Sequence, residues 1–351
     1  MKARFSGVAL DACVGVVPRE VSYFDDEIAN YSHDRASSLK LKAVMGYGEH
    51  RVAPAGTTTA DLAQAGVAHL VERGLLEVGQ IDAFYFVSQT PDYVIPPTSA
   101  TLHGKLGLKA GTYCVDINEG CNGFIKGLFE ACAFLNVTDS QCAVIVAGDV
   151  LSQRVSPRDR NSYPLIGDAA TVTVLRKDAA AAPIDIEICH DGAGFDKLII
   201  PAGGARCPSS EATLRFEMDD EGNWRNQEQL RMNGRDVFAF TQTVVPRFLE
   251  AFTTARGQTF PDYDRLYFHQ ANAFIIDRLR KKFGVDEWVM PDRVVRQYGN
   301  SSSGTIPMLI ATEPARDAAL RCLLSGFGVG LSWGAADLIL KPGSSMGVIE
   351  T

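Results

Sequence analysis

A cysteine flanked by glycines, Cys121, is the residue of this chain best suited to nucleophilic chemistry. It lies in the segment Asp116–Phe124, where Gly120 and Gly123 allow a sharp turn and a close approach of substrate. Apolar residues recur at helical spacing over 122–135, which predicts a helix that starts beside the cysteine. Because the positive end of a helix dipole stabilises a thiolate, we expect a lowered pKa for Cys121. The alternative from this segment alone is a buried structural cysteine.

Two further segments supply polar groups that a reactive thiol needs. His269 follows the short apolar stretch Leu266–Phe268, and Asn300 lies in the glycine- and serine-rich turn Tyr298–Pro307. A histidine and a carboxamide at such positions can activate a thiol or stabilise an oxyanion by hydrogen bonding. Taken singly, His269 has the alternative interpretation of a hydrogen-bonded core residue, and Asn300 that of a turn residue.

The order of these segments resembles the ketoacyl synthase III family of the thiolase superfamily. Members of that family carry Cys-x-Gly-Phe, His-Gln-Ala-Asn, Gly-Asn-Thr/Ser-Ser and Phe-Gly-x-Gly-x-Thr/Ser-Trp-Gly segments in this order. The corresponding segments here are Cys121–Phe124, His269–Asn272, Gly299–Ser302 and Phe327–Gly334. The resemblance covers nearly the whole chain. It implies a five-layer αβαβα sandwich built from two similar halves, and a homodimer.

The resemblance also implies a two-step reaction and a role for each residue. Cys121 accepts an acyl group from a thioester, and backbone N–H groups at Cys121 and Val329 form the oxyanion hole. His269 and Asn300 then stabilise the enolate left when malonyl-ACP, a malonyl group on acyl carrier protein, loses CO2. The enolate attacks the acyl group and gives a 3-oxoacyl thioester, as in fatty-acid or polyketide assembly. No cofactor is expected beyond the acyl-CoA or acyl-ACP substrate.

Other positions match substrate contacts of the family. Arg154 corresponds to an arginine that contacts the coenzyme A nucleotide, Phe238 to a residue at the active-site entrance, and Asn272 to a substrate contact. Ile95 corresponds to the residue that a partner subunit contributes to the acyl pocket. Its side chain is smaller than the usual phenylalanine, so we expect a longer or branched acyl group.

Two basic regions bear on the partners. Lys281 and Lys282 match basic family positions and are expected to dock the acidic carrier protein, with a solvated helix face as the alternative. Lys40 and Val44 replace a tryptophan and an arginine that hold coenzyme A in the best-studied members. A lysine contacts phosphate only as a point charge. We therefore expect a donor other than acetyl-CoA, either a different acyl-CoA or an acyl-ACP.

Three other functions remain open from the sequence. Acyl transfer to an oxygen or nitrogen acceptor, in secondary metabolism or polysaccharide modification, would not require decarboxylation of malonyl-ACP. A non-catalytic partner subunit would not be acylated at Cys121. A cysteine hydrolase using Cys121, His269 and Asn300 would release free acid and form no carbon–carbon bond. The asparagine favours condensation, because relatives that only transfer acyl groups can lack it.

The elements that must position these residues follow an α/β pattern, for which we expect mostly parallel, buried strands. A helix is predicted over Thr59–Arg73. Strands are predicted at Ile81–Ser88, Cys142–Asp149 and Ala169–Leu175, and again at Tyr263–Phe268, Ala318–Ser325 and Gly334–Leu340. The alanine-rich piece Asp178–Pro183 marks the predicted boundary between a half spanning 1–178 and a half spanning 179–351.

Composition excludes several classes of protein. The 351 residues carry a formal net charge of -8, which gives no support for nucleic-acid binding. No apolar run reaches the ~18 residues of a membrane span. The stretch Met1–Leu10 resembles a first strand rather than a signal peptide. The eight cysteines form no Cys-x-x-Cys pair, so we expect no metal site, and a reducing cytoplasm is the simplest compartment.

Overall fold

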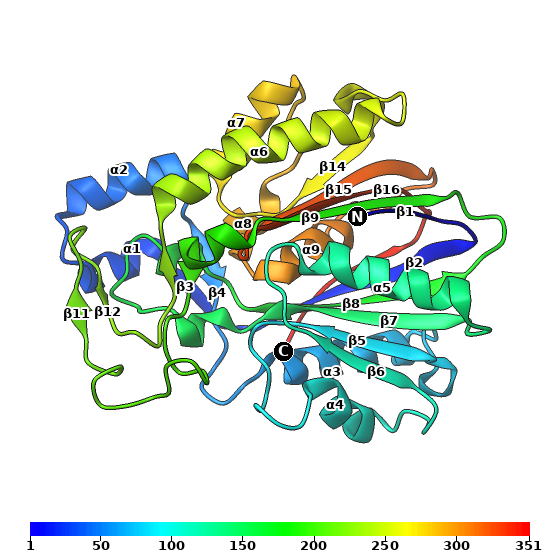
Figure 1. Ribbon diagram of the computed structural model, residues 1–351, viewed down its shortest axis with the longest axis horizontal. Coiled ribbons are helices and arrows are strands. Elements are labelled where there is room, and N and C mark those ends of the chain that lie inside the picture. Colours follow the sequence, from blue (N-terminus) through cyan, green and yellow to red (C-terminus); the bar gives the residue numbers. More distant parts are fainter.

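Two β-sheets with a layer of helices between them and further helices on their outer faces make up the protein (Figure 1). The computed structural model describes residues 1–351. The layer between the sheets contains α5 (Gly123–Val137) and α9 (Thr305–Ala311), and the outer layers contain α6 (Gly234–Thr254) with α7 (Ala273–Phe283) and α3 (Thr59–Glu72) with α4 (Thr98–Leu106). This arrangement confirms the predicted five-layer αβαβα sandwich.

The two sheets share a common core order. The first sheet runs β17 (Ser345–Glu350), β2 (Val8–Val17), β8 (Ala169–Lys177), β7 (Cys142–Asp149), β5 (Ala83–Val87), β6 (Tyr113–Ile117). The second runs β1 (Lys2–Phe5), β9 (Ile184–His190), β16 (Ser332–Leu340), β15 (Leu320–Gly328), β14 (Arg265–Phe268). In each sheet one antiparallel pair, β8–β7 or β16–β15, is followed by a parallel neighbour, β5 or β14. The strands predicted to echo one another therefore occupy equivalent places.

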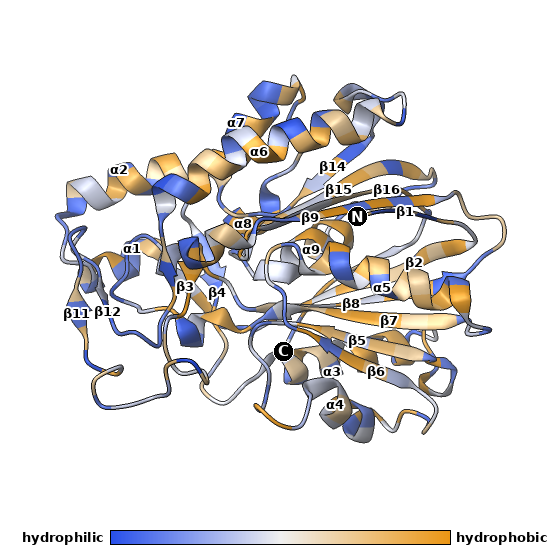
Figure 2. Ribbon diagram, viewed as in Figure 1, coloured by the Kyte–Doolittle hydropathy of each residue, from blue (hydrophilic) through white to orange (hydrophobic).

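The expectation of mostly parallel strands was wrong. Pairs β2–β8, β7–β8, β1–β9, β9–β16 and β15–β16 are antiparallel. A continuous apolar run reports burial on both faces of a strand and carries no information on its direction. Figure 2 shows that β5 and β7 are almost uniformly hydrophobic, as strands covered on both faces must be.

Each end of the chain adds a strand to the sheet that is formed mainly by the opposite half. The predicted single strand over Met1–Leu10 is instead two strands, β1 and β2, separated by a turn at Gly7, whose φ of 71 favours glycine. β1 pairs with β9 in the second sheet, whereas β17 pairs with β2 in the first. The division at residue 178 stays a prediction, and the two terminal strands do not follow it.

Short elements connect the main strands and helices. They are α1 (Phe24–Glu27), α2 (Arg35–Met45), α8 (Arg293–Gln297), the strand pairs β3 (Val21–Tyr23) with β4 (Glu49–Arg51), β10 (Leu198–Ile199) with β13 (Arg231–Met232) and β11 (Glu217–Met218) with β12 (Trp224–Arg225), and the 3-10 helices η1 (Ile28–Asn30), η2 (Val78–Gln80), η3 (Leu151–Arg154), η4 (Tyr163–Leu165), η5 (Gly192–Lys197), η6 (Phe260–Asp262) and η7 (Ser302–Gly304). None of the helices is both long enough and apolar enough to cross a membrane.

Helix α5 is held firmly between the sheets, which fixes the segment that precedes it. Phe124, Ile125, Leu128, Ala131 and Leu135, the apolar positions of the predicted helix, are all fully buried. Burial of the phenylalanine, isoleucine and leucine side chains contributes roughly 1.5–3 kcal/mol each relative to exposure. The residues just before the helix, Cys121 among them, therefore sit on a rigid support.

Candidate active site

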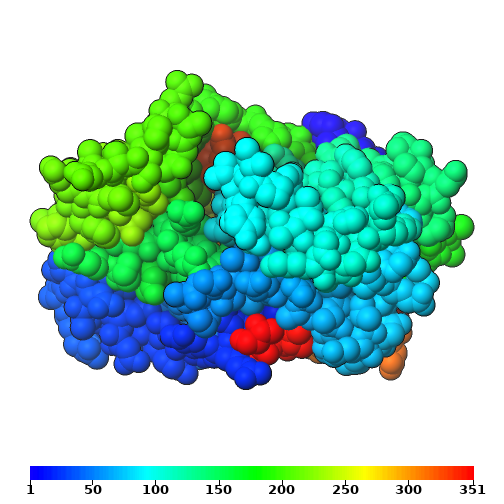
Figure 3. Space-filling model, turned by 90° about the horizontal axis from the view of Figure 1, so that it is seen from below, coloured from blue at the N-terminus to red at the C-terminus, as the bar shows by residue number.

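A cavity of ≈ 650 Å³ brings together residues from distant parts of the chain. Its lining includes Cys121 from the first half and His269 and Asn300 from the second, so the three predicted chemical groups share one chamber. Figure 3 shows the molecule hollowed between the green segment near residue 200 and the cyan segment near residue 100, with orange-red chain at the bottom of the hollow. More than half of the lining residues are hydrophobic.

Cys121 lies immediately before Asn122, the N-cap of α5. Burial raises the pKa of its thiol to about 11, and the carboxylates of Glu119 and Asp149 also raise it. Hydrogen bonds from the backbone N–H groups of Val329 and of Cys121 itself act in the opposite direction but do not prevail. The expected lowering of the pKa was therefore wrong. The loss of solvent around the sulfur outweighs the two backbone donors.

The two predicted oxyanion donors both lie at the sulfur. Val329 is carried by the loop between β15 and β16, which pair as an antiparallel hairpin. Gly328 packs so tightly there that a Cβ on it would lie 2.6 Å from Sγ of Cys121. The backbone N–H of Val329 is close enough to the cysteine to lower the pKa of its thiol. An acyl carbonyl bound to this sulfur would thus have two backbone donors beside it.

His269 follows β14 directly and is almost fully buried. Its backbone N–H donates to the carbonyl oxygen of Ser325 (2.8 Å), and its Nδ1 contacts Oγ1 of Thr305 at 2.7 Å. Burial lowers the pKa of the imidazole to about 3. The ring is consequently neutral at physiological pH, and Nδ1 is committed to Thr305, so Nε2 is the nitrogen left for a ligand.

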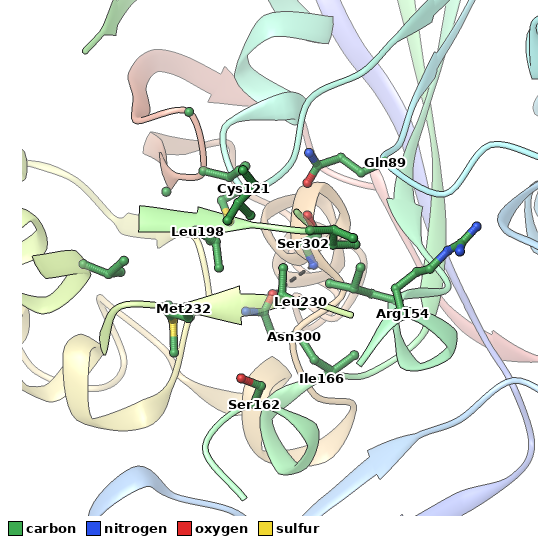
Figure 4. Close-up of a pocket in the computed structure, with 18 of the residues that line it drawn as sticks. Gln89, Cys121, Arg154, Ser162, Ile166, Leu198, Leu230, Met232, Asn300 and Ser302 are labelled. Carbon is green, nitrogen blue, oxygen red and sulfur yellow. Dashed lines mark hydrogen bonds between the residues drawn. The ribbon is translucent and has the colours of Figure 1, made fainter. Parts of the chain in front are cut away.

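Asn300 is held by a close approach of two backbone segments. Its N–H donates to the carbonyl oxygen of Leu165 at 2.7 Å, and its carbonyl accepts from the N–H of Gly167 at 3.2 Å. A side chain at Gly167 would lie 1.8 Å from the carbonyl oxygen of Tyr298, so only glycine permits the contact. Oδ1 of Asn300 accepts a hydrogen bond from the N–H of Ser302 at 2.9 Å, which leaves Nδ2 free to donate into the cavity (Figure 4).

Two of the predicted substrate contacts line the same cavity. Arg154 is exposed, and Figure 4 shows its guanidinium directed away from Cys121. Asn272 is buried and caps α7, where its Oδ1 accepts from the N–H of Ile275 at 2.8 Å. Arg154 therefore suits an anionic group at the outer part of the cavity, whereas the oxygen of Asn272 already has a structural partner.

The other predicted contacts lie outside the cavity of their own chain. Phe238 stacks on Phe274, with the ring centroids 5.4 Å apart. Its neighbour Val237 lines the cavity instead. Ile95 is 85% exposed and does not reach Cys121 from the same chain. Lys281 and Lys282 are exposed on α7, and Lys281 pairs with Asp277 at 2.7 Å.

Lys40 and Val44, which stand at the two replaced coenzyme A positions, are exposed on α2 and do not line the cavity. The structure also holds no group of three or more His, Cys, Asp or Glu side chains that could bind a metal ion. All eight cysteines are free thiols, and Cys13, Cys132, Cys142 and Cys322 are buried.

Sequence reasoning missed several polar residues around the three central groups. Gln89 and Asn118 line the cavity, and Figure 4 shows the Gln89 side chain extending toward Cys121. Thr305 contacts His269, and Asp149 lies close enough to Cys121 to affect its pKa. The signal for Asp149 was present, since a carboxylate that ends a continuous apolar strand requires buried hydrogen-bond partners. No sequence pattern indicated Gln89 or Asn118.

Comparisons with known proteins agree with the geometry. Residues 115–192 match the family model of 3-oxoacyl-[acyl-carrier-protein] synthase III, and residues 254–339 match the model of its C-terminal part. A putative 3-oxoacyl-[acyl-carrier-protein] synthase 3 of Campylobacter jejuni is 28% identical over 97% of this chain and 96% of its own length. The β-ketoacyl-[acyl-carrier-protein] synthase III of Chlamydia muridarum is 30% identical over 84% of this chain and 88% of its own.

A solved structure supports the same relationship. The 3-oxoacyl-(acyl-carrier protein) synthase from Burkholderia xenovorans LB400 superimposes with a TM-score of 0.91 at 31% identity, and the match covers 100% of this chain and 99% of the other. Both the fold and the sequence over nearly the whole chain are therefore similar to those of proteins in this group.

Proposed function

The chain belongs to the β-ketoacyl-[acyl-carrier-protein] synthase III family, and we propose that Cys121, His269 and Asn300 are the residues with which it performs that family's condensation. It is an acyltransferase that joins an acyl thioester to malonyl-ACP and yields a 3-oxoacyl thioester. One observation carries the residue assignment: a thiol, a neutral imidazole and an inward-facing carboxamide line a single cavity.

In the first half-reaction the sulfur of Cys121 attacks the carbonyl of the acyl thioester. A new S–C bond forms, the bond to the donor's sulfur breaks, and the proton of the Cys121 thiol ends on the released donor thiol. The N–H groups of Val329 and Cys121 stabilise the oxyanion in between. Because the resting group is a neutral thiol, the reaction must also remove its proton, and the released donor thiolate can take it up.

In the second half-reaction malonyl-ACP enters and its C–CO2 bond breaks. The electron pair becomes an enolate, whose oxygen accepts hydrogen bonds from Nδ2 of Asn300 and from Nε2–H of His269, the tautomer in which Nδ1 accepts from the Thr305 hydroxyl. Two neutral donors stabilise this charge without supplying a strong acid that would protonate the carbanion. The enolate carbon attacks the acyl carbonyl, the S–C bond breaks, and the Cys121 thiolate recovers a proton from solvent. Each such donor contributes roughly 10²–10³ in rate.

The donor is an acyl chain on a phosphopantetheine arm, delivered by coenzyme A or by a carrier protein. The largely apolar lining suits an acyl chain and the arm. Arg154 lies at an exposed position of the lining where it can meet a phosphate. The exposed Lys40 and Val44 offer neither the aromatic surface nor the guanidinium of the best-studied members, so we propose a donor other than acetyl-CoA.

The carrier protein docks on α7. Lys281 and Lys282 are the basic residues expected there, and they belong to a basic run on the helix after His269 that also includes Arg278 and Arg280. Arg278 is exposed and its guanidinium lies 5.1 Å from the ring centroid of Phe274, which itself stacks on Phe238. Since Lys281 is paired with Asp277, Arg278 and Lys282 carry most of the attraction for an acidic partner.

A second copy of the chain completes the site. β6 is an edge strand that pairs only with β5 and presents an open edge. In the segment between β5 and α4, Tyr93, Val94 and Ile95 are 58%, 99% and 85% exposed, which is unusual for three consecutive apolar residues. A homodimer formed along β6 would cover these side chains and place Ile95 at the partner's acyl pocket.

Intact-mass spectrometry tests the reaction directly. The protein is mixed with saturated and branched acyl thioesters from acetyl to dodecanoyl, on coenzyme A and on carrier protein, and malonyl-ACP is then added. The expected result is one acyl adduct on the peptide containing Cys121, with a preference beyond acetyl, that disappears on addition of malonyl-ACP as 3-oxoacyl-ACP forms. Release of free acid, or transfer to an added alcohol or amine without decarboxylation, would contradict the proposal.

A further inference from the structure

Two buried ionisable residues, Glu27 and His50, lie behind the cavity and take no part in the two half-reactions above. Glu27 ends α1 and is 5% exposed, and His50 lies on β4 and is 1% exposed. Nε2 of His50 lies 2.6 Å from Oε1 of Glu27, and its Nδ1 contacts the carbonyl oxygen of Ile166. Because Ile166 lines the cavity, this buried pair is directly attached to the cavity wall.

The hydrogen-bond partners fix the protonation of the pair. A carbonyl oxygen only accepts hydrogen bonds, so Nδ1 of His50 must carry a proton. Glu27 accepts two further hydrogen bonds, from Oγ of Ser22 (2.5 Å) and from the hydroxyl of Tyr31 (3.2 Å). Burial raises the pKa of the Glu27 carboxyl, but the hydrogen bonds to it prevail and leave that pKa below its ordinary value. Glu27 is therefore a carboxylate, and both ring nitrogens of His50 act as donors.

The carbonyl that His50 binds belongs to the segment that holds Asn300. Ile166 and Asn300 form a parallel bridge and lie side by side (Figure 4). In this bridge the carbonyl of Leu165 accepts from the N–H of Asn300 at 2.7 Å, and the N–H of Gly167 donates to the carbonyl of Asn300 at 3.2 Å. The carbonyl of Ile166 itself takes no part in the bridge and accepts from His50 instead.

His50 also lies against the turn that carries Asn300. A Cβ added to Gly299 would lie 2.9 Å from Cβ of His50, so the two residues are in close contact. The next residue of β4, Arg51, donates its N–H to the carbonyl oxygen of Tyr298 at 3.2 Å. Strand β4 therefore supports the turn before Asn300 through its backbone, and the segment beside it through the His50 ring.

We propose that His50 is a positioning residue for decarboxylation: it binds the Ile166 carbonyl and thereby keeps the Asn300 carboxamide directed into the cavity. The carboxylate of Glu27 holds the imidazole in place. This rests on the proposed function, because it assumes that Asn300 stabilises the enolate. Acylation should not depend on the link, since Cys121 is supported by α5 and by the loop between β15 and β16.

Two substitutions at residue 50 separate the two hydrogen bonds of the ring. The amide nitrogen of asparagine takes about the place of Nδ1 of histidine, and that of glutamine about the place of Nε2. His50→Asn therefore keeps a donor for Ile166, whereas His50→Gln keeps only the donor for residue 27. Both are made together with Glu27→Gln, because a buried carboxylate without its cation would destabilise the protein by itself. Glu27→Gln alone is the matched control.

The experiment measures CO2 release from malonyl-ACP and, separately, acylation of Cys121 by intact mass, in the full-length wild type, the control and the two double variants. We expect Glu27→Gln/His50→Gln to slow decarboxylation by roughly 10- to 100-fold, because small misplacements of a catalytic group have effects of this order. Glu27→Gln and Glu27→Gln/His50→Asn should lose roughly 2- to 5-fold, the effect of a single hydrogen bond. Acylation should change by less than about 3-fold throughout, since the two sites are independent.

Amide hydrogen exchange reports on the link itself. Peptides that contain Gly167 and Asn300 should exchange faster in Glu27→Gln/His50→Gln than in Glu27→Gln, because their backbone bridge is loosened. The His50→Asn double variant should exchange at nearly the rate of the control.

Three results would each overturn the inference: equal decarboxylation with asparagine and glutamine at residue 50, unchanged exchange at the bridge, or a parallel loss of acylation. If a double variant does not fold, as judged by its thermal transition, Glu27→Leu replaces it. That variant leaves the ring of His50 without its acceptor and must lose more decarboxylation than Glu27→Gln. A wild type that releases no CO2 from malonyl-ACP would instead overturn the proposed function itself.

Discussion

The two sides of the cavity are built in different ways. Cys121 is held by main-chain geometry: the buried start of α5 and the hairpin loop at Val329 supply its contacts, and no side-chain hydrogen bond is needed. His269 and Asn300 are oriented by a hydroxyl and by a left-handed turn, through Thr305 and Ser302. The difference indicates that the acylation side depends on the shape of the main chain, whereas the decarboxylation side depends on a few polar side-chain atoms. The two half-reactions should therefore be separable by mutation.

The largest separation is expected from Cys121→Ala. Removal of the sulfur eliminates the only proposed acyl acceptor, so no acyl adduct should form with any thioester, while CO2 release from malonyl-ACP should continue because its donors are untouched. Intact-mass spectrometry and a CO2 assay on the same sample measure both outcomes. Cys207→Ala, which removes a partly exposed thiol outside the cavity, is the matched control and should acylate normally. Loss of the adduct in Cys207→Ala would contradict the assignment.

The converse separation is expected from Asn300→Asp. The substitution preserves size and the oxygen that accepts from the N–H of Ser302, but it replaces the Nδ2 donor by a second, negatively charged oxygen. Decarboxylation and condensation should fall by roughly 10²–10³, while Cys121 is still acylated. Asn118→Asp places the same charge in the same cavity without altering a proposed donor, and it should cost far less. Equal losses in the two variants would mean that charge in the cavity, and not loss of the donor, is responsible.

The sequence predicts the central residues on both sides of the cavity, but not how they are held. Cys121, His269 and Asn300 each lie in a short segment whose residue order was sufficient to place them, and all three line one cavity. The places of Ala318–Ser325 and Gly334–Leu340 in the second sheet followed from their likeness to strands of the first. Strand direction did not, because an apolar run looks the same in either direction.

What the sequence does not contain is the outcome of long-range packing. The pKa of Cys121 depends on burial beneath Phe327–Val329, some two hundred residues later in the chain, and a local helix-dipole argument gives the wrong sign. The split of Met1–Leu10 into two strands depends on which sheet edge each one meets. The hydrogen bond that orients the Asn300 side chain comes from Ser302 in a positive-φ conformation that serine rarely adopts, so only coordinates could reveal it.

The raised pKa of Cys121 gives a prediction for alkylation. A thiol with a pKa of about 11 is almost entirely protonated at pH 8, and its thiolate fraction is lower by roughly 10² than that of a thiol at the ordinary value of 9.0. The rate of Cys121 alkylation by iodoacetamide should therefore keep rising from pH 8 to beyond pH 10. Peptide mapping of the alkylated protein measures it, with urea-unfolded protein as the control. A plateau near pH 8 would show that the helix dipole and backbone donors prevail over burial.

The smallest effect is expected on the outer surface, at α7, where carrier-protein docking is proposed. Arg278 forms no ion pair, whereas the charge of Lys281 is offset by Asp277 at 2.7 Å. Arg278→Ala should raise KM for malonyl-ACP by roughly 3- to 10-fold at low salt with kcat little changed, and Lys281→Ala by less than about 2-fold. The difference should shrink as salt is added, because exposed charges are screened.

Steady-state kinetics over a salt series measure this difference in KM. The control is Lys2→Ala, which removes a surface cation paired with Glu187 on the second sheet. A larger effect from Lys281→Ala than from Arg278→Ala would show that the carrier protein displaces Asp277 and uses the paired lysine.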